Sequence, residues 1–362
     1  MNITNLLCEL DIQGVKLWQE NGQLKIRGPQ SVLTSAITEQ LRIHKEQIIN
    51  LLLQYDNRGL TAEIKPLIPA IQDRYKPFPL TEIQQAYWVA FTGGFELGDI
   101  TPHIYVELSR NDLVKQRLTR AWQQLIARHD VLRTVVLPSS EQQVLAETPD
   151  YEIQYSDFRQ LNEQDKNAAL ETIRYTFSHQ CFDPTHWPRF ALHVVQITDS
   201  NFRIGVSLDL SAIDFVGILK LINELSQLYE NPVVELPQLE ITFRDYVLAE
   251  EKLRHTQLYK HSQQYWFDRI DSLPPPLQLP QAKQSSELKN YHFKNYTAIL
   301  SAELCQVLHK RAKQFNITLS TLLLSAFAEI LTLWSDSPRF TLNLTQYRRL
   351  SLHPQVNQII GD

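Results

Sequence analysis

"NFRIGVSLDLSAIDFVGI", residues 201–218, joins an alternating strand to the start of a helix. Apolar side chains fall on one face of its first half, at Phe202, Ile204, Val206 and Leu208. Asp209 therefore leaves the strand end on the opposite, polar face. Asp214 falls in or near the first turn of the helix, where the helix dipole favours an anion by roughly 0.3–1 kcal/mol. The stretch thus places two carboxylates where a strand becomes a helix.

The spacing of these two acids leaves three interpretations open: an acid/base pair, a metal site, or charges that hold a turn together. An aspartate in a first turn is more often a cap than a catalyst, and one at a strand end is usually solvated. Ser211 or Asp214 could cap the helix. Metal binding is disfavoured because no histidine or third acid lies at a suitable local spacing.

An α/β (α+β) fold follows from the segments on either side of this stretch. Helical periodicity covers residues 81–91, 112–129, 163–180, 241–270, 302–314 and 318–334. Strand-like alternation covers residues 103–110, 131–138, 190–198, 201–210, 292–300 and 339–346.

Length and composition are those of a well-cored protein of two or three domains. The chain has 362 residues, of which 43% are hydrophobic and 21% charged. A net charge of −5 argues against a general nucleic-acid partner. With no long apolar run and an acidic, amphipathic start, we expect no membrane span and no secretory signal. Three cysteines without metal-like spacing favour reduced thiols and a cytoplasmic protein.

Residues 1–60 read as a small helix–hairpin–helix unit. Asn21-Gly22 lies between two alternating runs, which is the strongest short hairpin signal. The unit carries no clustered acid, base or nucleophile, so we do not expect chemistry there. Its hairpin presents three cations and an aromatic residue, namely Lys16, Trp18, Lys25 and Arg27. These are either solvated charges or a peptide-docking edge, because a two-stranded sheet has free edges that can add a strand.

Proline-rich residues 61–77 read as a linker, and the α/β region begins at residue 78. Pro232 and Pro237 mark a junction within it. We therefore predict an N-terminal lobe over 78–235 and part of a C-terminal lobe over 236–362.

Six motifs in this order resemble the heterocyclization domain of nonribosomal peptide synthetases, a branch of the condensation-domain superfamily. They are "FPLTEIQQAYWVAF" (78–91), "RHDVLRTVV" (128–136), "DLSAID" (209–214), "YWFDRIDSLPPPLQLP" (265–280), "ITLSTLLLSAFAEILTLWS" (317–335) and "FTLNLTQYRRLSLHPQVNQIIGD" (340–362). The first 60 residues also resemble the docking domain that precedes some synthetase subunits. The resemblance covers almost the whole chain.

This resemblance implies a fold of two lobes of the chloramphenicol-acetyltransferase kind with a tunnel between them. It implies amide formation between an acyl thioester and a cysteinyl, seryl or threonyl thioester, followed by cyclodehydration to a thiazoline or oxazoline. Both substrates would ride on phosphopantetheine arms of upstream and downstream peptidyl carrier proteins, so no cofactor is expected to be bound directly. The docking unit would receive a C-terminal peptide of the preceding subunit, and an acidic peptide would suit its cations.

In the family, an Asp-x4-Asp pattern replaces the histidine motif of ordinary condensation domains, and the chain departs from the family pattern at two further places, Gly217 and its final motif. Leu210 stands where ordinary condensation domains have the second histidine of their motif, and leucine cannot transfer a proton. Gly217 stands where a serine is usual. The final motif stops at Asp362, before the Phe-Thr that normally continues it. The resemblance therefore implies that the last strands of the second lobe, and the Thr and Asp thought to assist cyclodehydration, lie beyond Asp362.

For the site, we predict that Asp209 and Asp214 mainly shape the meeting point of the two thioester arms. Each would pair with an arginine, since an unpaired buried carboxylate is costly. Arg133 and Arg128 are the nearest motif candidates, and Arg133 could equally be a surface charge. Asn343 and Thr345 share one face of a predicted strand and could line the tunnel.

Two other functions stay open at this point. One is an acyltransferase that forms only the amide and leaves a linear product. The other is a non-catalytic unit that only docks a partner. The acceptor residue, the donor acyl group and the final product are not readable from the residues.

Overall fold

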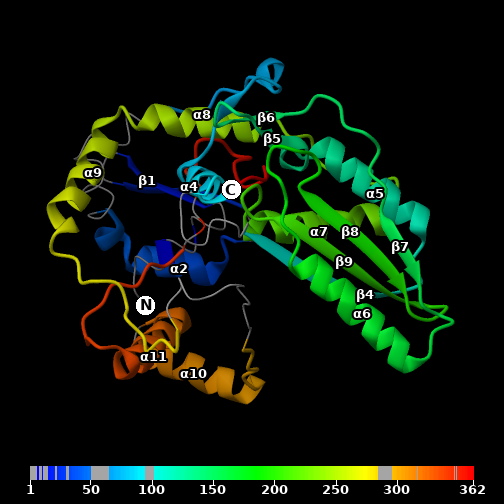
Figure 1. Cartoon of the computed structure of the whole chain (residues 1–362). Helices are drawn as coiled ribbons and strands as arrows, with labels where there is room; N and C mark the ends of the chain where they lie inside the picture. Colours follow the sequence, from blue (N-terminus) through cyan, green and yellow to red (C-terminus); the bar gives the residue numbers. More distant parts are fainter. Residues whose placement is uncertain are drawn as a thin grey trace. The chain divides into compact units, whose positions relative to one another are not determined.

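The structure, a computed structural model, describes residues 6–7, 10, 15–20, 23–29, 32–49, 65–93, 102–283, 296–315, 317–345, 347 and 349–362. The chain divides into two compact units. The first comprises residues 1–64 and 256–345, and the second comprises residues 65–255 and 346–362. Figure 1 labels the elements of both units.

A four-stranded sheet is the centre of the second unit, with strand order β4-β9-β8-β7. Its strands are β4 (His103–Asn111), β9 (Asn201–Asp209), β8 (Phe190–Gln196) and β7 (Gln154–Asp157). Only the β7–β8 pair is parallel among these strands; the other two pairs are antiparallel. The register sets Phe190 opposite Leu208 and brings Asp209 to the sheet end opposite His103.

Helices cover both faces of this sheet (Figure 1). On one face lie α5 (Lys115–Arg128) and α7 (Phe215–Glu230), which share one core with the apolar side of β8 and β9. The predicted apolar face of β9 is part of that core: Phe202, Ile204, Val206 and Leu208. On the other face lies α6 (Glu163–Ser178), where the Ser207 hydroxyl donates to the Phe177 carbonyl at 3.3 Å. The polar face of β9 is therefore covered rather than open to solvent.

The rest of the second unit surrounds the ends of this sheet. A smaller sheet has the order β3-β6-β5. The elements are β3 (Phe78–Pro79), β6 (Glu141–Val144), β5 (Thr134–Val136), α4 (Glu82–Phe91), α8 (Phe243–Leu253) and two 3-10 turns, η2 (Ile71–Asp73) and η3 (Asp130–Arg133). A capping box begins α4, because the Thr81 side chain accepts from the Gln84 amide while the Gln84 side chain accepts from the Thr81 amide.

In the first unit, the predicted hairpin is confirmed as β1 (Lys16–Glu20) paired with β2 (Gln23–Arg27). Helix α2 (Ser35–Ile43) follows, with Thr34 as its N-cap. Apolar residues from the described parts of this region form a separate small core: Leu6, Leu10, Val15, Leu41 and Ile48. Leu17, Leu24 and Ile26 pack against it, so one face of the hairpin is used for packing.

Three more helices belong to the first unit: α9 (Gln257–Ile270), α10 (Ala302–Gln314) and α11 (Leu319–Trp334). The predicted single helix over 241–270 is wrong, because α8 ends at Leu253 and Thr256 caps a new helix by accepting from the Tyr259 amide. Within the described ranges no single helix is long and apolar enough to cross a membrane. The bent pair α10–α11, which turns by 97°, reaches the required length and composition only when both helices are combined.

Two predicted strands of the first unit are absent from its described residues. The described part of 292–300, residues 296–300, has no regular structure. In the described part of 339–346, only Thr341 bridges a neighbour, Pro276, and its amide donates to the Pro275 carbonyl at 2.9 Å. A strand needs a hydrogen-bonded partner along its length, and alternation in sequence does not provide one.

Candidate functional site

The loop from Asp209 to Asp214 is held by backbone contacts on both sides. It leaves β9 at Asp209 and enters α7 at Phe215. The amides of Ala212 and Ile213 donate to the Asp209 carbonyl at 3.2 and 3.3 Å, which closes a turn. The Leu210 amide donates to the Pro102 carbonyl at 2.9 Å. The loop is thus a fixed element rather than a free connection.

Asp209 is 1% exposed, and both of its carboxylate oxygens are engaged. One oxygen accepts from Arg189, whose Nε and Nη2 lie 2.8 and 2.7 Å away. The other accepts from the Ser211 amide at 2.8 Å and the Ser211 hydroxyl at 2.7 Å. Arg189 also donates to the Ser211 hydroxyl. The expectation of a solvated strand-end acid is wrong. The Asp209 carboxylate is buried, it is paired with Arg189, and it also accepts hydrogen bonds from its own loop.

Asp214 is the N-cap of α7, as the cap interpretation predicted. Its Oδ1 accepts from the Gly217 amide at 2.5 Å, and its Oδ2 accepts from Arg349 Nη2 at 3.3 Å. Arg349 also donates to the carbonyls of Ile359 and Gly361 at 2.7 and 2.8 Å. Burial raises the pKa of Asp214, although the Gly217 amide and Arg349 oppose that rise. The cap thereby joins α7 to the segment 349–361.

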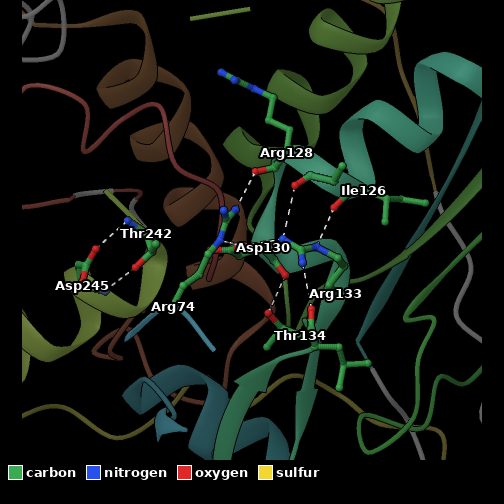
Figure 2. Close-up of polar contacts among 10 residues, drawn as sticks. Arg74, Ile126, Arg128, Asp130, Arg133, Thr134, Thr242 and Asp245 are labelled. Atoms are coloured by element: carbon green, nitrogen blue, oxygen red, sulfur yellow. Dashed lines mark hydrogen bonds and ion pairs between the residues drawn. The ribbon is translucent and has the colours of Figure 1, made fainter. Parts of the chain in front are cut away.

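The predicted pairing of these acids with arginines is confirmed, but the predicted arginines are wrong. Arg133 is buried, and its donors reach the carbonyls of Ile126 at 3.0 Å and Leu145 at 2.9 Å, together with the Asp130 carboxylate at 3.0 Å. Figure 2 shows its guanidinium among these groups, with Arg74 bound to the same Asp130 at 2.6 Å. Arg133 is therefore neither a surface charge nor a partner of Asp209 or Asp214. It connects the end of α5 to the residue that follows β6.

Arg128 is likewise committed elsewhere. It donates to Glu224 on α7 at 3.1 Å, and His129 meets the same carboxylate at 2.6 Å. These contacts hold the pKa of Glu224 at about 2, against the effect of its burial. The motif "RHDVLRTVV" therefore supplies structural ties between α5, α7 and η3.

Leu210 and Gly217 have packing explanations. Leu210 is partly buried against the main core of the unit, so the position that carries a histidine in ordinary condensation domains is an apolar contact here. A Cβ at Gly217 would lie 2.6 Å from Ile360 Cγ2 and 3.0 Å from Ile213 Cγ1, closer than real Cβ contacts. A serine at this position would therefore require the Ile360 side chain to move.

A third carboxyl belongs to this site and was missed in the sequence. Burial and the charges of Asp214 and Asp209 raise the pKa of Asp362 to about 6, while Arg349 opposes the rise. The Asp362 carbonyl accepts from the Thr81 hydroxyl at 3.1 Å. A carboxyl that titrates near neutral pH can accept and return a proton. Among the described residues, no group of three or more His, Cys, Asp or Glu is arranged to hold a metal ion.

A pocket opens beside Asp209 and contains about 320 Å³ of space, its open mouth included. Asp209, Arg189, Ser211 and Gln84 form its polar part. The remaining wall is mainly apolar, with three aromatic residues: Leu80, Tyr87, Trp88, Phe91, Pro102, Val136 and Pro184. Burial and the charges of Asp362 and Asp209 raise the pKa of Tyr87, so its hydroxyl stays protonated. The loop therefore borders a cavity in which a small group can lie.

Asn343 and Thr345 are exposed and belong to the first unit. The loop belongs to the second unit, so their predicted part in a tunnel stays a prediction.

The hairpin places the predicted docking residues in two cross-strand pairs. Lys16 pairs with Arg27, and Trp18 pairs with Lys25. Residues directly opposite each other in an antiparallel pair share one face. Trp18 is 42% exposed and Arg27 is exposed, whereas Leu17 and Ile26 of the other face pack on the small core. The face away from the core thus carries an aromatic ring and cations.

Sequence reasoning missed Arg189, Arg349 and Asp362. Arg189 precedes the apolar strand β8, and its carbonyl accepts from the Asp209 amide at 3.1 Å. Only the strand register makes these two residues neighbours. Arg349 lies in the quoted final motif, where an arginine pair was visible but its target was not.

Comparison with known proteins gives two family matches. The condensation domain profile matches residues 75–362, and the TubC N-terminal docking domain profile matches residues 3–54. Among solved structures, the EpoB cyclization-docking bidomain of Sorangium cellulosum superposes with a TM-score of 0.79. It is 34% identical, and the match covers 99% of this chain and 70% of that one.

Curated relatives are much longer proteins. Bacitracin synthase 1 of Bacillus licheniformis is 35% identical over 286 residues, which cover 79% of this chain and 5% of the relative. Pyochelin synthetase PchF of Pseudomonas aeruginosa is 30% identical over 363 residues, which cover 100% of this chain and 20% of the relative. The chain therefore spans a fifth or less of these two relatives.

Proposed function

The chain belongs to the condensation-domain family of nonribosomal peptide synthetases and carries a TubC-type docking domain at its start, and on that premise we propose that it is a heterocyclization domain. It would join a carrier-bound acyl thioester to a cysteinyl, seryl or threonyl thioester. It would then close the acceptor side chain onto the new amide to give a thiazoline or oxazoline.

The observation that carries the proposal is the Asp209–Asp214 loop. Asp209 is buried and Asp214 is half-buried, both accept from arginine and amide donors, and Leu210 replaces the histidine that an ordinary condensation domain carries. Such a loop positions groups but lacks an imidazole base. The likeness to a cyclization-docking bidomain over 99% of the chain supports the same assignment.

The proposed chemistry balances without a redox partner. The acceptor amine attacks the donor thioester carbonyl, the donor thiol leaves, and an amide forms. The acceptor thiol or hydroxyl then attacks the amide carbon, and the amide oxygen departs as water. The second step needs a group that moves protons near neutral pH. Burial and the charges of Asp214 and Asp209 raise the pKa of Asp362 to about 6, which makes this carboxyl one candidate for that group.

An intact-mass assay tests the proposal. Carrier proteins loaded with an acyl group and with cysteine are incubated with the chain, and the product masses are measured. We expect the condensed product minus one further water. Condensed product without that loss supports the alternative, an amide-forming domain only. If the chain gives no condensed product, only the docking function would remain for it.

The hairpin supports a second proposal, that the docking unit binds an acidic C-terminal peptide of an upstream subunit. Trp18 and Arg27 are exposed, and the strand register pairs them with Lys25 and Lys16. Binding of such a peptide, measured by calorimetry, should weaken with added salt and with Lys25→Glu. If neither affects the affinity, charge is not what recognises the peptide.

A further inference from the structure

The pocket beside Asp209 is built from one face of α4. Gln84, Trp88 and Phe91 follow each other at helical spacing, and Tyr87 lies between them on the same side. Gln84 is buried, where its amide donates to the Ser211 carbonyl at 3.2 Å and so fixes the helix to the loop. Towards its C-terminal end, the same helix face turns from polar to aromatic.

The rings of Trp88 and Phe91 line the pocket and are not fully buried in the core. Trp88 and Phe91 stack with ring centroids 5.8 Å apart and planes at 24°, and the Trp88 indole donates to Ser140 at 3.1 Å. Phe91 is still 37% exposed. Aromatic side chains at the wall of a pocket favour a planar or branched apolar ligand.

In the polar part of the same pocket, the charges of Arg189 and Asp209 neutralise each other. Arg189 and Asp209 are each other's partners at 2.7–2.8 Å, and Ser211 is shared between them. A charged ligand group would have to displace one of these contacts, so the pocket favours a neutral one.

We infer that this pocket binds the acyl group of the donor thioester and selects a neutral aromatic acyl group. The inference rests on the proposed function, which brings two thioesters to the Asp209 loop. A cysteine, serine or threonine side chain is small and polar and gains little from stacked rings. The donor group is therefore the substrate that fits the wall formed by Trp88 and Phe91.

Binding is tested first, because it needs no turnover. S-Benzyl-pantetheine and S-methyl-pantetheine serve as stable thioether probes, and their affinities for the whole chain are measured by calorimetry. We expect a preference for the benzyl probe that drops about threefold to tenfold in Trp88→Ala, the range for a lost ring contact. Trp88→Phe should restore most of it, since the ring returns without the indole donor.

A matched control lies on the same helix. Val89 is 45% exposed and does not line the pocket, so Val89→Ala should leave the preference as it is. Equal preferences in wild type and Trp88→Ala would overturn the inference, as would an equal drop in Val89→Ala.

The condensation assay then separates this inference from the proposed function. Carriers loaded with benzoyl or acetyl groups compete for one acceptor, and the ratio of kcat/KM values is measured. Trp88→Ala should lower the benzoyl-to-acetyl ratio by the same threefold to tenfold. An unchanged ratio with active enzyme refutes the inference and leaves the function standing. Probe preference without any condensed product refutes the function alone.

Discussion

Two buried arginine–carboxylate pairs in the second unit, Arg189–Asp209 and Arg133–Asp130, have similar chemistry and different surroundings. Arg133 donates to main-chain carbonyls as well as to Asp130, and Arg74 donates to the same oxygen of that carboxylate (Figure 2). Asp209 is instead shared between Arg189 and its own loop, and the pair borders a pocket.

The difference shows how charged motif residues can be sorted. A charged side chain that donates mainly to nearby backbone carbonyls holds neighbouring segments of the chain together. A charge that orders a loop at the edge of a cavity fixes the place where a ligand arrives. Five substitutions test how these regions are held, beginning with the largest expected effect.

Replacing Arg133 should cost the most stability. Arg133→Met leaves Asp130 without one cation and the carbonyls of Ile126 and Leu145 without donors. We expect the free energy of unfolding to fall by about 3–5 kcal/mol, measured by urea denaturation. Arg159→Met is the control, because its partners Asp157 and Asp199 are exposed and such pairs contribute about 1 kcal/mol or less. A stable Arg133→Met protein without turnover would reinstate Arg133 as a reaction residue.

The two carboxylates should separate activity from stability. Asp209→Asn weakens the hold of Arg189 on the loop and disturbs the position of Ser211. Misplacing a site in this way costs about 10²-fold in turnover, equivalent to about 2.7 kcal/mol. Asp130→Asn should lower stability while turnover per folded molecule stays near wild type. Equal losses of turnover in both variants would mean that the two pairs do not differ in role.

The pH dependence of stability tests the charge of the loop region. Asp362 has a pKa of about 6 in the folded chain, set by burial, Asp214 and Asp209 against Arg349, and about 3.9 when unfolded. Between these values the folded chain binds more protons, so the free energy of unfolding falls as pH rises from about 4 to 6. Asp362→Asn should reduce this fall by on the order of 2 kcal/mol. Urea denaturation at pH 4.5 and 7 measures it.

The control for this effect is Asp199→Asn, a substitution of an exposed acid whose ion pair is at the surface. It should leave the slope nearly unchanged. The same slope in wild type and Asp362→Asn would place the Asp362 carboxyl in contact with water.

The smallest expected effect is at Gly217. Gly217→Ser adds a Cβ 2.6 Å from Ile360 Cγ2, next to the Asp214 cap. Such overpacking should cost about 1–2 kcal/mol in the free energy of unfolding. Val216→Ser is its neighbour on α7, is 38% exposed, and should cost about 0.5 kcal/mol or less. If Gly217→Ser is neutral, the segment around Ile360 yields easily, and the loop is less firmly held than its contacts indicate.

Local patterns predicted local features well. The alternation of β9, the Asp214 cap, and the Asn21-Gly22 signal of the hairpin each depend on residues a few positions apart. The wrong predictions of a helix over 241–270 and a strand over 339–346 also came from local patterns. Helix 241–270 breaks at Thr256 because a capping side chain there outweighs continuous periodicity. Residues 339–345 alternate in sequence, yet among them only Thr341 bridges a neighbour.

What the sequence by itself determined was that Asp209 ends a strand, that Ser211 or Asp214 caps the following helix, and that Leu210 cannot transfer a proton. The tertiary structure alone decided which cation each acid meets. Arg133 was a predicted partner because of its motif, but strand register brings Arg189 to Asp209, and Arg349 reaches Asp214 across 135 positions. Charges act over a few ångströms of space, and separation along a folded chain does not measure that distance.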